Sequence, residues 1–304
     1  MRRLFPLLLL LCSCDDQQPA PPAPPPAAQA PAELVDTPEF SGHNAYTHCA
    51  AICAMGPRYS GSAAYETQLQ YLEKHLHAAG WQTARDTFAA PNGVRMCNLR
   101  AFRSSTPAPL LISCHVDTKI NIAPDFQSAD DGASGAAVLL ELARTLKEER
   151  VELIFLDGEE AFAPRMSDED GLYGSRFDVA RRGSILPRWQ INLDMVGGRN
   201  KTIAVPALDT SDAMYAQYTA AVKGLGFSEM KWTAWPGSYL DDHVPYMEAG
   251  VDSLNLIAVF AGSNWWHTPR DNMSRICPRS LHESGLITRQ LIGQLLSADD
   301  ANAQ

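Results

Sequence analysis

The segment "ASGAAVLLELARTLKEERVELIFLDGEE" (residues 133–160) decides the fold, because an expected helix leads directly into an expected strand. Apolar side chains recur at helical spacing over residues 133–149, with Ala137, Leu140 and Leu146 along one face and a charged end. This spacing predicts an amphipathic helix. The short, largely apolar run "VELIFL" (residues 151–156) has the length of a strand and predicts a buried one.

The same alternation continues along the rest of the chain, without an internal repeat. We expect further strands at residues 98–103, 108–114, 189–196 and 252–260, and further helices at residues 66–80, 211–224 and 279–296. Alternating strands and helices predict an α/β fold. The expectation is a single domain over residues 36–299, with a central, twisted, mostly parallel or mixed sheet flanked by helices and a polar tail at residues 300–304.

Length and charge limit the classes of function. The chain has 304 residues, of which 45% are hydrophobic, and this is enough for one sizeable core. Its net charge of -10 argues against nucleic acid as a partner, because nucleic-acid binders need a basic face. Neither property identifies the oligomeric state.

The N-terminus has the pattern of an export signal. Residues 1–14, "MRRLFPLLLLLCSC", combine two arginines with a leucine run far shorter than the ~20 residues of a spanning helix. The stretch from Leu11 to Cys14 resembles a bacterial lipobox, which predicts lipidation of Cys14 and a lipid anchor in a membrane; an ordinary cleaved signal is the alternative. Asp15 then favours the periplasmic face of the inner membrane. Residues 15–35 are rich in Pro and Ala and predict a spacer.

The cysteines leave one question open. Outside the signal, the chain has five of them: Cys49, Cys53, Cys97, Cys114 and Cys277. Cys49 and Cys53 are four residues apart and would share one face of a helix, so both a disulfide and two buried thiols are compatible with the spacing. The odd number leaves at least one cysteine without a partner in the chain.

Polar side chains cluster where the expected strands end. The candidates are His115, Asp131, Glu159, Glu160, Asp194 and His267. Open α/β sheets bind ligands beyond the carboxyl ends of their strands, so we expect one cleft that contains them all. Taken singly, these residues also fit a core histidine, a helix cap or a solvated turn.

Together, the clustered side chains predict a metal site, because zinc takes nitrogen and oxygen ligands and a catalytic site keeps one position open. A cation would also explain why two glutamates are adjacent despite their repulsion. One of them would bind the metal, and the other would face the substrate as a base.

The order and the residues of the motifs resemble those of the zinc aminopeptidase superfamily and, within it, the animal-type glutaminyl-peptide cyclotransferases. The similar stretches are "GPRYSGS" (residues 56–62), "CHVDTK" (114–119), "FLDGEEAF" (155–162), "DGLYGSRF" (170–177), "DDHVPYMEAGV" (241–251) and "WHTPRDN" (266–272). The resemblance covers residues 36–297 and implies the zinc aminopeptidase (phosphorylase/hydrolase-like) fold. It also implies an enzyme that converts the N-terminal glutamine of peptides or proteins to pyroglutamate and releases ammonia.

The resemblance implies a role for individual residues. One zinc ion would be bound by Asp131, Glu160 and His267, and Glu159 would be the general acid/base. Asp194 and Asp241 would form a carboxylate network beside Glu159 and would raise its pKa. Trp266 would form part of the glutamine pocket, and Phe260 and Tyr239, which are near it in sequence, would add apolar walls.

One alternative function stays open. In two-zinc aminopeptidases of this superfamily, the positions of His115 and Asp194 bind a second metal ion, and both residues are present here. A zinc aminopeptidase with one or two ions is therefore the second interpretation.

Three departures from the cyclotransferase pattern concern the pocket and its surroundings. Arg165 stands where the family has a tryptophan, Leu240 where a glutamine is common, and Ala136 where the family's disulfide partner would be. Cys114 is therefore expected to be a free thiol. The first two changes leave the preference for the rest of the peptide undetermined.

Overall fold

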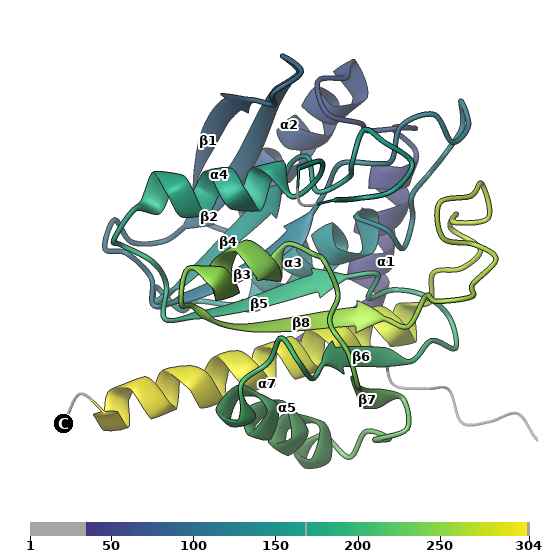
Figure 1. The fold of residues 1–304 in the computed structure, drawn as a ribbon. Coiled ribbons are helices and arrows are strands. Elements are labelled where there is room, and N and C mark those ends of the chain that lie inside the picture. The colour runs from purple at the N-terminus through teal and green to yellow at the C-terminus, as the bar shows by residue number, and fades with distance from the viewer. Residues whose placement is uncertain (1–34, 168, 303–304) are drawn as a thin grey trace, which may run out of the picture. The chain divides into compact units, whose positions relative to one another are not determined.

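The computed structural model describes residues 35–167 and 169–302, shown in Figure 1. The predicted signal peptide, the lipidation site Cys14 and nearly all of the predicted spacer lie outside these residues and stay predictions. Within the described residues, no helix is both long and apolar enough to cross a membrane.

One mixed sheet forms the centre of the fold, as predicted. Its eight strands lie in the order β1-β2-β4-β3-β5-β8-β6-β7. They are β1 (Gln82–Ala89), β2 (Arg95–Phe102), β3 (Leu110–His115), β4 (Val151–Leu156), β5 (Trp189–Asp194), β6 (Ile203–Pro206), β7 (Trp232–Trp235) and β8 (Asp252–Ala258). The four central strands β4, β3, β5 and β8 are parallel, and their carboxyl ends therefore meet at one edge.

Three of these strands are absent from the sequence-based expectation. β1 alternates between exposed and half-buried residues and contains several polar side chains, so it lacks the apolar signal of a core strand. β6 and β7 are four residues each, too short for a periodic pattern. All three lie at the two ends of the sheet, away from its parallel centre.

Helices cover both faces of the sheet (Figure 1). They are α1 (Gly42–Cys53), α2 (Ala63–Ala78), α3 (Ala133–Thr145), α4 (Tyr173–Arg182), α5 (Asp212–Gly224), α6 (His243–Glu248) and α7 (Pro278–Asn302). α1, α3, α5 and α7 pack together on one face, whereas α4 and α6 cover the other. α7 continues to Asn302, so the first three residues of the predicted tail at residues 300–304 are helical.

Two glycines allow α3 to begin close to the strand ends. Gly132 has a φ of 96°, and a Cβ at this position would lie 3.1 Å from the carbonyl oxygen of Asp117 and from the ring of His115. A Cβ on Gly135 would lie 2.7 Å from Cys114 Cβ. Because glycine tolerates positive φ and close contact, the N-terminal end of α3 is held directly against β3.

The open question about the cysteines is answered for the described residues. Cys49 and Cys53 are both buried on α1 and are free thiols, and Cys114 is also a buried free thiol, as expected. The other two cysteines are free as well.

A buried ionic cluster joins α4 to the sheet. The fully buried carboxylate of Asp178 accepts hydrogen bonds from Arg181 at 2.6 Å, Arg182 at 2.5 Å and the Tyr246 hydroxyl at 2.7 Å. Arg182 also donates to Glu152 of β4 at 2.6 Å. Removing Asp178 would leave the buried Tyr246 hydroxyl without its acceptor and Arg182 with only one of its two carboxylates, which is costly.

We therefore predict that Asp178→Ala lowers the free energy of unfolding by about 3–5 kcal/mol, as measured by urea denaturation. The matched control is Asp299→Ala, because Asp299 pairs with Arg188 at 2.8 Å in a solvent-exposed ion pair. That control is expected to cost less than about 1 kcal/mol. Equal losses in the two variants would contradict the structural role given to the buried cluster.

Candidate functional site

The parallel strands bring the predicted residues together at one edge of the sheet. His115 and Asp194 are the last residues of β3 and β5, and Glu159 and Glu160 follow β4 after a short turn. Asp131 immediately precedes Gly132, the residue from which α3 begins. His267 reaches the same place from the segment that follows β8.

A cavity of about 500 Å³ opens at this edge. Its floor contains five carboxylate side chains that are each at most 8% exposed: Asp131, Glu159, Glu160, Asp194 and Asp241. Its apolar wall includes Tyr239, Phe260 and Trp266. The predicted catalytic, ligand and substrate-binding side chains thus line one cavity, except for His115, which lies just beneath it.

Asp131, Glu160 and His267 form the first potential metal-binding set. Each offers one ligand atom, and these atoms lie within 4.8 Å of one another. His267 Nε2 lies 3.0 Å from Glu160 Oε1 and 3.4 Å from Asp131 Oδ2. The φ of His267 is 52°, a conformation that non-glycine residues seldom adopt outside special sites.

His115, Asp131 and Asp194 form a second set that meets the same distance criterion. His115 Nε2 lies 3.1 Å from Asp131 Oδ1 and 3.2 Å from Asp194 Oδ1. Asp131 belongs to both sets, so its two oxygens face different histidines. This geometry offers positions for one ion or for two.

The donor groups fit a zinc ion. Asp131 Oδ2 is buried and has no hydrogen-bond partner among the described residues, which is costly unless a cation or a proton donor is near. Burial would lower the pKa of His267, but the nearby carboxylates of Asp131 and Glu160 raise it to about 10. The site thus attracts positive charge, and imidazole and carboxylate are both zinc ligands.

Glu159 differs from its neighbour Glu160, since it belongs to neither metal-binding set, although both line the cavity. Burial raises its pKa well above the usual range, His115 opposes this shift, and the charges of Glu160 and Asp241 add to it. The predicted rise is therefore present, but burial is its main cause. A carboxyl group with a raised pKa can both accept and return a proton near neutral pH.

Asp117 holds the two glutamates in place, a role that the sequence analysis missed. Its carboxylate accepts hydrogen bonds from the backbone N–H of Glu159 at 3.2 Å and of Glu160 at 3.1 Å. Asp271 accepts in the same way from the backbone N–H of Asp131 at 3.1 Å. Both aspartates lie within the quoted motifs "CHVDTK" and "WHTPRDN", but sequence alone does not say that they contact backbone.

Asp241 is fixed by two buried asparagines that were also missed. Asn192 of β5 donates to its carboxylate at 3.1 Å, and Asn255 of β8 donates at 2.7 Å. A signal existed, because Asn192 lies two residues before Asp194 and thus on the same face of the strand. Burial and the charge of Asp241 together raise the pKa of Asp194 to about 8.

The aromatic wall ends at the candidate metal ligand. Ring centroids are separated by 5.4 Å between Tyr239 and Phe260, 4.6 Å between Phe260 and Trp266, and 3.9 Å between Trp266 and His267. The three predicted pocket residues therefore form one continuous surface beside the donor set.

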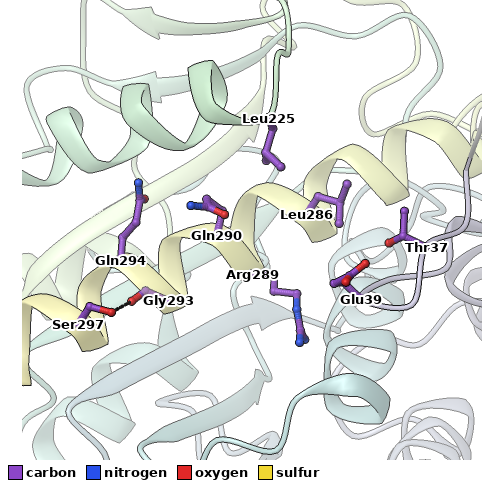
Figure 2. Close-up of a pocket in the computed structure, with 9 residues that line it drawn as sticks. All are labelled: Thr37, Glu39, Leu225, Leu286, Arg289, Gln290, Gly293, Gln294 and Ser297. Atoms are coloured by element: carbon purple, nitrogen blue, oxygen red, sulfur yellow. Dashed lines mark hydrogen bonds between the residues drawn. The ribbon is translucent and has the colours of Figure 1, made fainter.

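A second large hollow lacks this chemistry. It measures about 650 Å³ and runs along α7, where Leu286, Gln290 and Gln294 line it (Figure 2). None of the carboxylates or histidines of the two metal-binding sets contributes to it. We therefore place the reaction in the cavity at the strand ends.

The chain is similar to proteins with two kinds of activity. The model of peptidase family M28 matches residues 99–292. A glutaminyl-peptide cyclotransferase of Gloydius blomhoffii is 30% identical over 71% of this chain and 71% of its own length. Aminopeptidase YwaD of Bacillus subtilis is 32% identical over 59% of this chain and 39% of its own length.

A solved structure agrees with the fold. The glutaminyl cyclase of Porphyromonas gingivalis has a TM-score of 0.74 and 28% sequence identity, covering 84% of this chain and 99% of that chain. The family resemblance inferred from the motifs is thereby confirmed. The chain belongs to peptidase family M28 and is an enzyme related to the glutaminyl-peptide cyclotransferases of that fold.

Proposed function

We propose that the chain converts the N-terminal glutamine of peptides and proteins to pyroglutamate and releases ammonia. The observation that supports this most directly is the different surroundings of two adjacent glutamates. Both line the aromatic-walled cavity, and burial raises the pKa of both, but Glu160 lies in a metal-binding set whereas Glu159 lies in neither. The similarity to cyclotransferases points in the same direction.

In the proposed reaction, the substrate's α-amine nitrogen bonds to the side-chain carbonyl carbon, and the side-chain nitrogen leaves as ammonia. A zinc ion bound by Asp131, Glu160 and His267 would supply Lewis-acid polarisation of that carbonyl group. Glu159 takes a proton from the attacking amine and gives it to the leaving nitrogen. The amine needs little activation, because its pKa of ~7.7–8.0 leaves much of it neutral near pH 8.

The cavity walls have a separate task in this proposal. Because the nucleophile and the carbonyl group belong to the same substrate, the enzyme gains most by folding the side chain into a reactive shape. Tyr239, Phe260 and Trp266 offer a flat apolar surface against which the glutamine methylenes can pack. The same surface excludes water, which would otherwise compete as a nucleophile.

A zinc aminopeptidase is the second candidate, and one specific observation favours it. The set of His115, Asp131 and Asp194 is intact beside the first set and shares Asp131 with it. Sites that hold two neighbouring metal ions typically assist hydrolysis by water. The similarity to the Bacillus aminopeptidase agrees with this alternative.

Peptide products distinguish the two candidates. We predict that the purified zinc-loaded protein releases ammonia from Gln-Ala and lowers the mass of this peptide by about 17 daltons, because cyclisation expels the side-chain nitrogen. Leu-Ala should remain intact. An ammonia assay and mass spectrometry give the two readouts. Release of free leucine without any pyroglutamate would contradict the cyclase proposal and support the aminopeptidase.

The two glutamates should fail in different ways when changed singly. We predict that Glu159→Gln keeps its zinc but loses about 10²- to 10⁴-fold in kcat, because a proton carrier is gone. Glu160→Gln should instead lose zinc, as measured by metal analysis after dialysis. Glu229→Gln, which alters an exposed glutamate outside the cavity, is the control for net charge. Retention of both metal and turnover in Glu159→Gln and Glu160→Gln would refute these roles.

A further inference from the structure

The mouth of the cavity has one exposed cationic side chain, Arg165. It is exposed and lines the cavity together with Pro164, Met166 and Leu240. Within the described part of the chain, the guanidinium forms neither a hydrogen bond nor an ion pair. An arginine has five donors in a planar fork and usually finds an acceptor, so this group is available to a ligand.

The loop that contains Arg165 is tied down at both ends. The carboxylate of Asp170 accepts from the backbone N–H of Phe162 at 2.9 Å and of Ala163 at 2.7 Å. The backbone of Ser167 donates to the carbonyl oxygen of Asp170 at 3.0 Å. Arg165 lies between these two anchors, so the loop holds it at the cavity mouth.

The other cation that lines the cavity is already engaged. Lys119 is only 5% exposed, donates to the carbonyl oxygen of Ala161 at 2.5 Å and lies 3.5 Å from Glu160. The other ionisable side chains that line the cavity are the carboxylates, Tyr239 and the histidine of the metal-binding set. Among the described lining residues, Arg165 is therefore the cation that a substrate can reach.

We infer that Arg165 binds a carboxylate that the substrate contains just beyond its N-terminal glutamine. This inference rests on the proposed function. When the glutamine side chain is at the floor, the residue after it must pass the rim, where the guanidinium can bind a carboxylate in bidentate fashion. The preferred substrates are peptides with Asp or Glu in the second position, or dipeptides whose terminal carboxylate lies there.

Arg165 is a local positive group on a chain that is negative overall. The net charge is -10, so any attraction of an acidic peptide to this cavity has to come from a group at the site itself. Arg165 stands where the resemblance implies a tryptophan in the related cyclotransferases, so a charged side chain takes the place of an aromatic one here.

The test compares kcat/KM for pairs of peptides that differ only in one carboxylate. Gln-Glu-NH₂ against Gln-Gln-NH₂ isolates a side-chain carboxylate, and Gln-Ala against Gln-Ala-NH₂ isolates a terminal one. The zinc-loaded wild type should favour the acidic member of at least one pair by about two- to fivefold, as expected for an exposed ion pair. High salt should reduce this preference.

Three variants assign the preference to one residue. Arg165→Gln should bring the ratio to about one, and Arg165→Lys should keep part of it. Lys223→Gln, which removes an exposed charge on α5, should keep all of it.

Two results would overturn the inference while leaving the proposed function intact. They are equal turnover of acidic and neutral peptides by the wild type, and a preference that survives in Arg165→Gln. A wild type that cyclises none of the four peptides would overturn the proposed function, and this inference with it.

Discussion

The crowding of buried carboxylates at one edge of the sheet is the constraint on which the site depends. Five acidic side chains lie on the floor of one cavity, and none is more than 8% exposed. Buried like charges repel strongly unless cations or protons compensate them. His115 and His267 lie beside these carboxylates and compensate part of their negative charge, and a bound metal ion would compensate the rest.

The fold creates this crowding and also separates the acids from one another. Parallel strands end at the same edge, and this brings Asp131, Glu160 and Asp194 within reach of two histidines. Backbone N–H groups and asparagine amides then hold the supporting carboxylates of Asp117 and Asp241. Because Glu160 lies beside His267 and Asp131 whereas Glu159 belongs to neither metal-binding set, two neighbouring glutamates can differ in function.

Much of this arrangement could be predicted from the sequence, because the parallel centre of the sheet consists of strongly apolar strands that each end in a polar motif. Strands β1, β6 and β7 could not be predicted. β1 is largely polar, and β6 and β7 have only four residues each, so none of them has a clear apolar pattern. The supporting roles of Asp117 and Asn192 were also missed. Such roles depend on hydrogen bonds between residues more than 40 positions apart in the sequence, which no local pattern contains.

The central claim is that Glu160 binds the metal and leaves Glu159 free for the proton. Anomalous X-ray scattering at the zinc edge, from crystals of the zinc-loaded protein, tests it most directly. We expect one strong peak bounded by Asp131, Glu160 and His267, with Glu159 outside its coordination distance. A peak that Glu159 coordinates, or a second peak of equal height between His115, Asp131 and Asp194, would contradict the account.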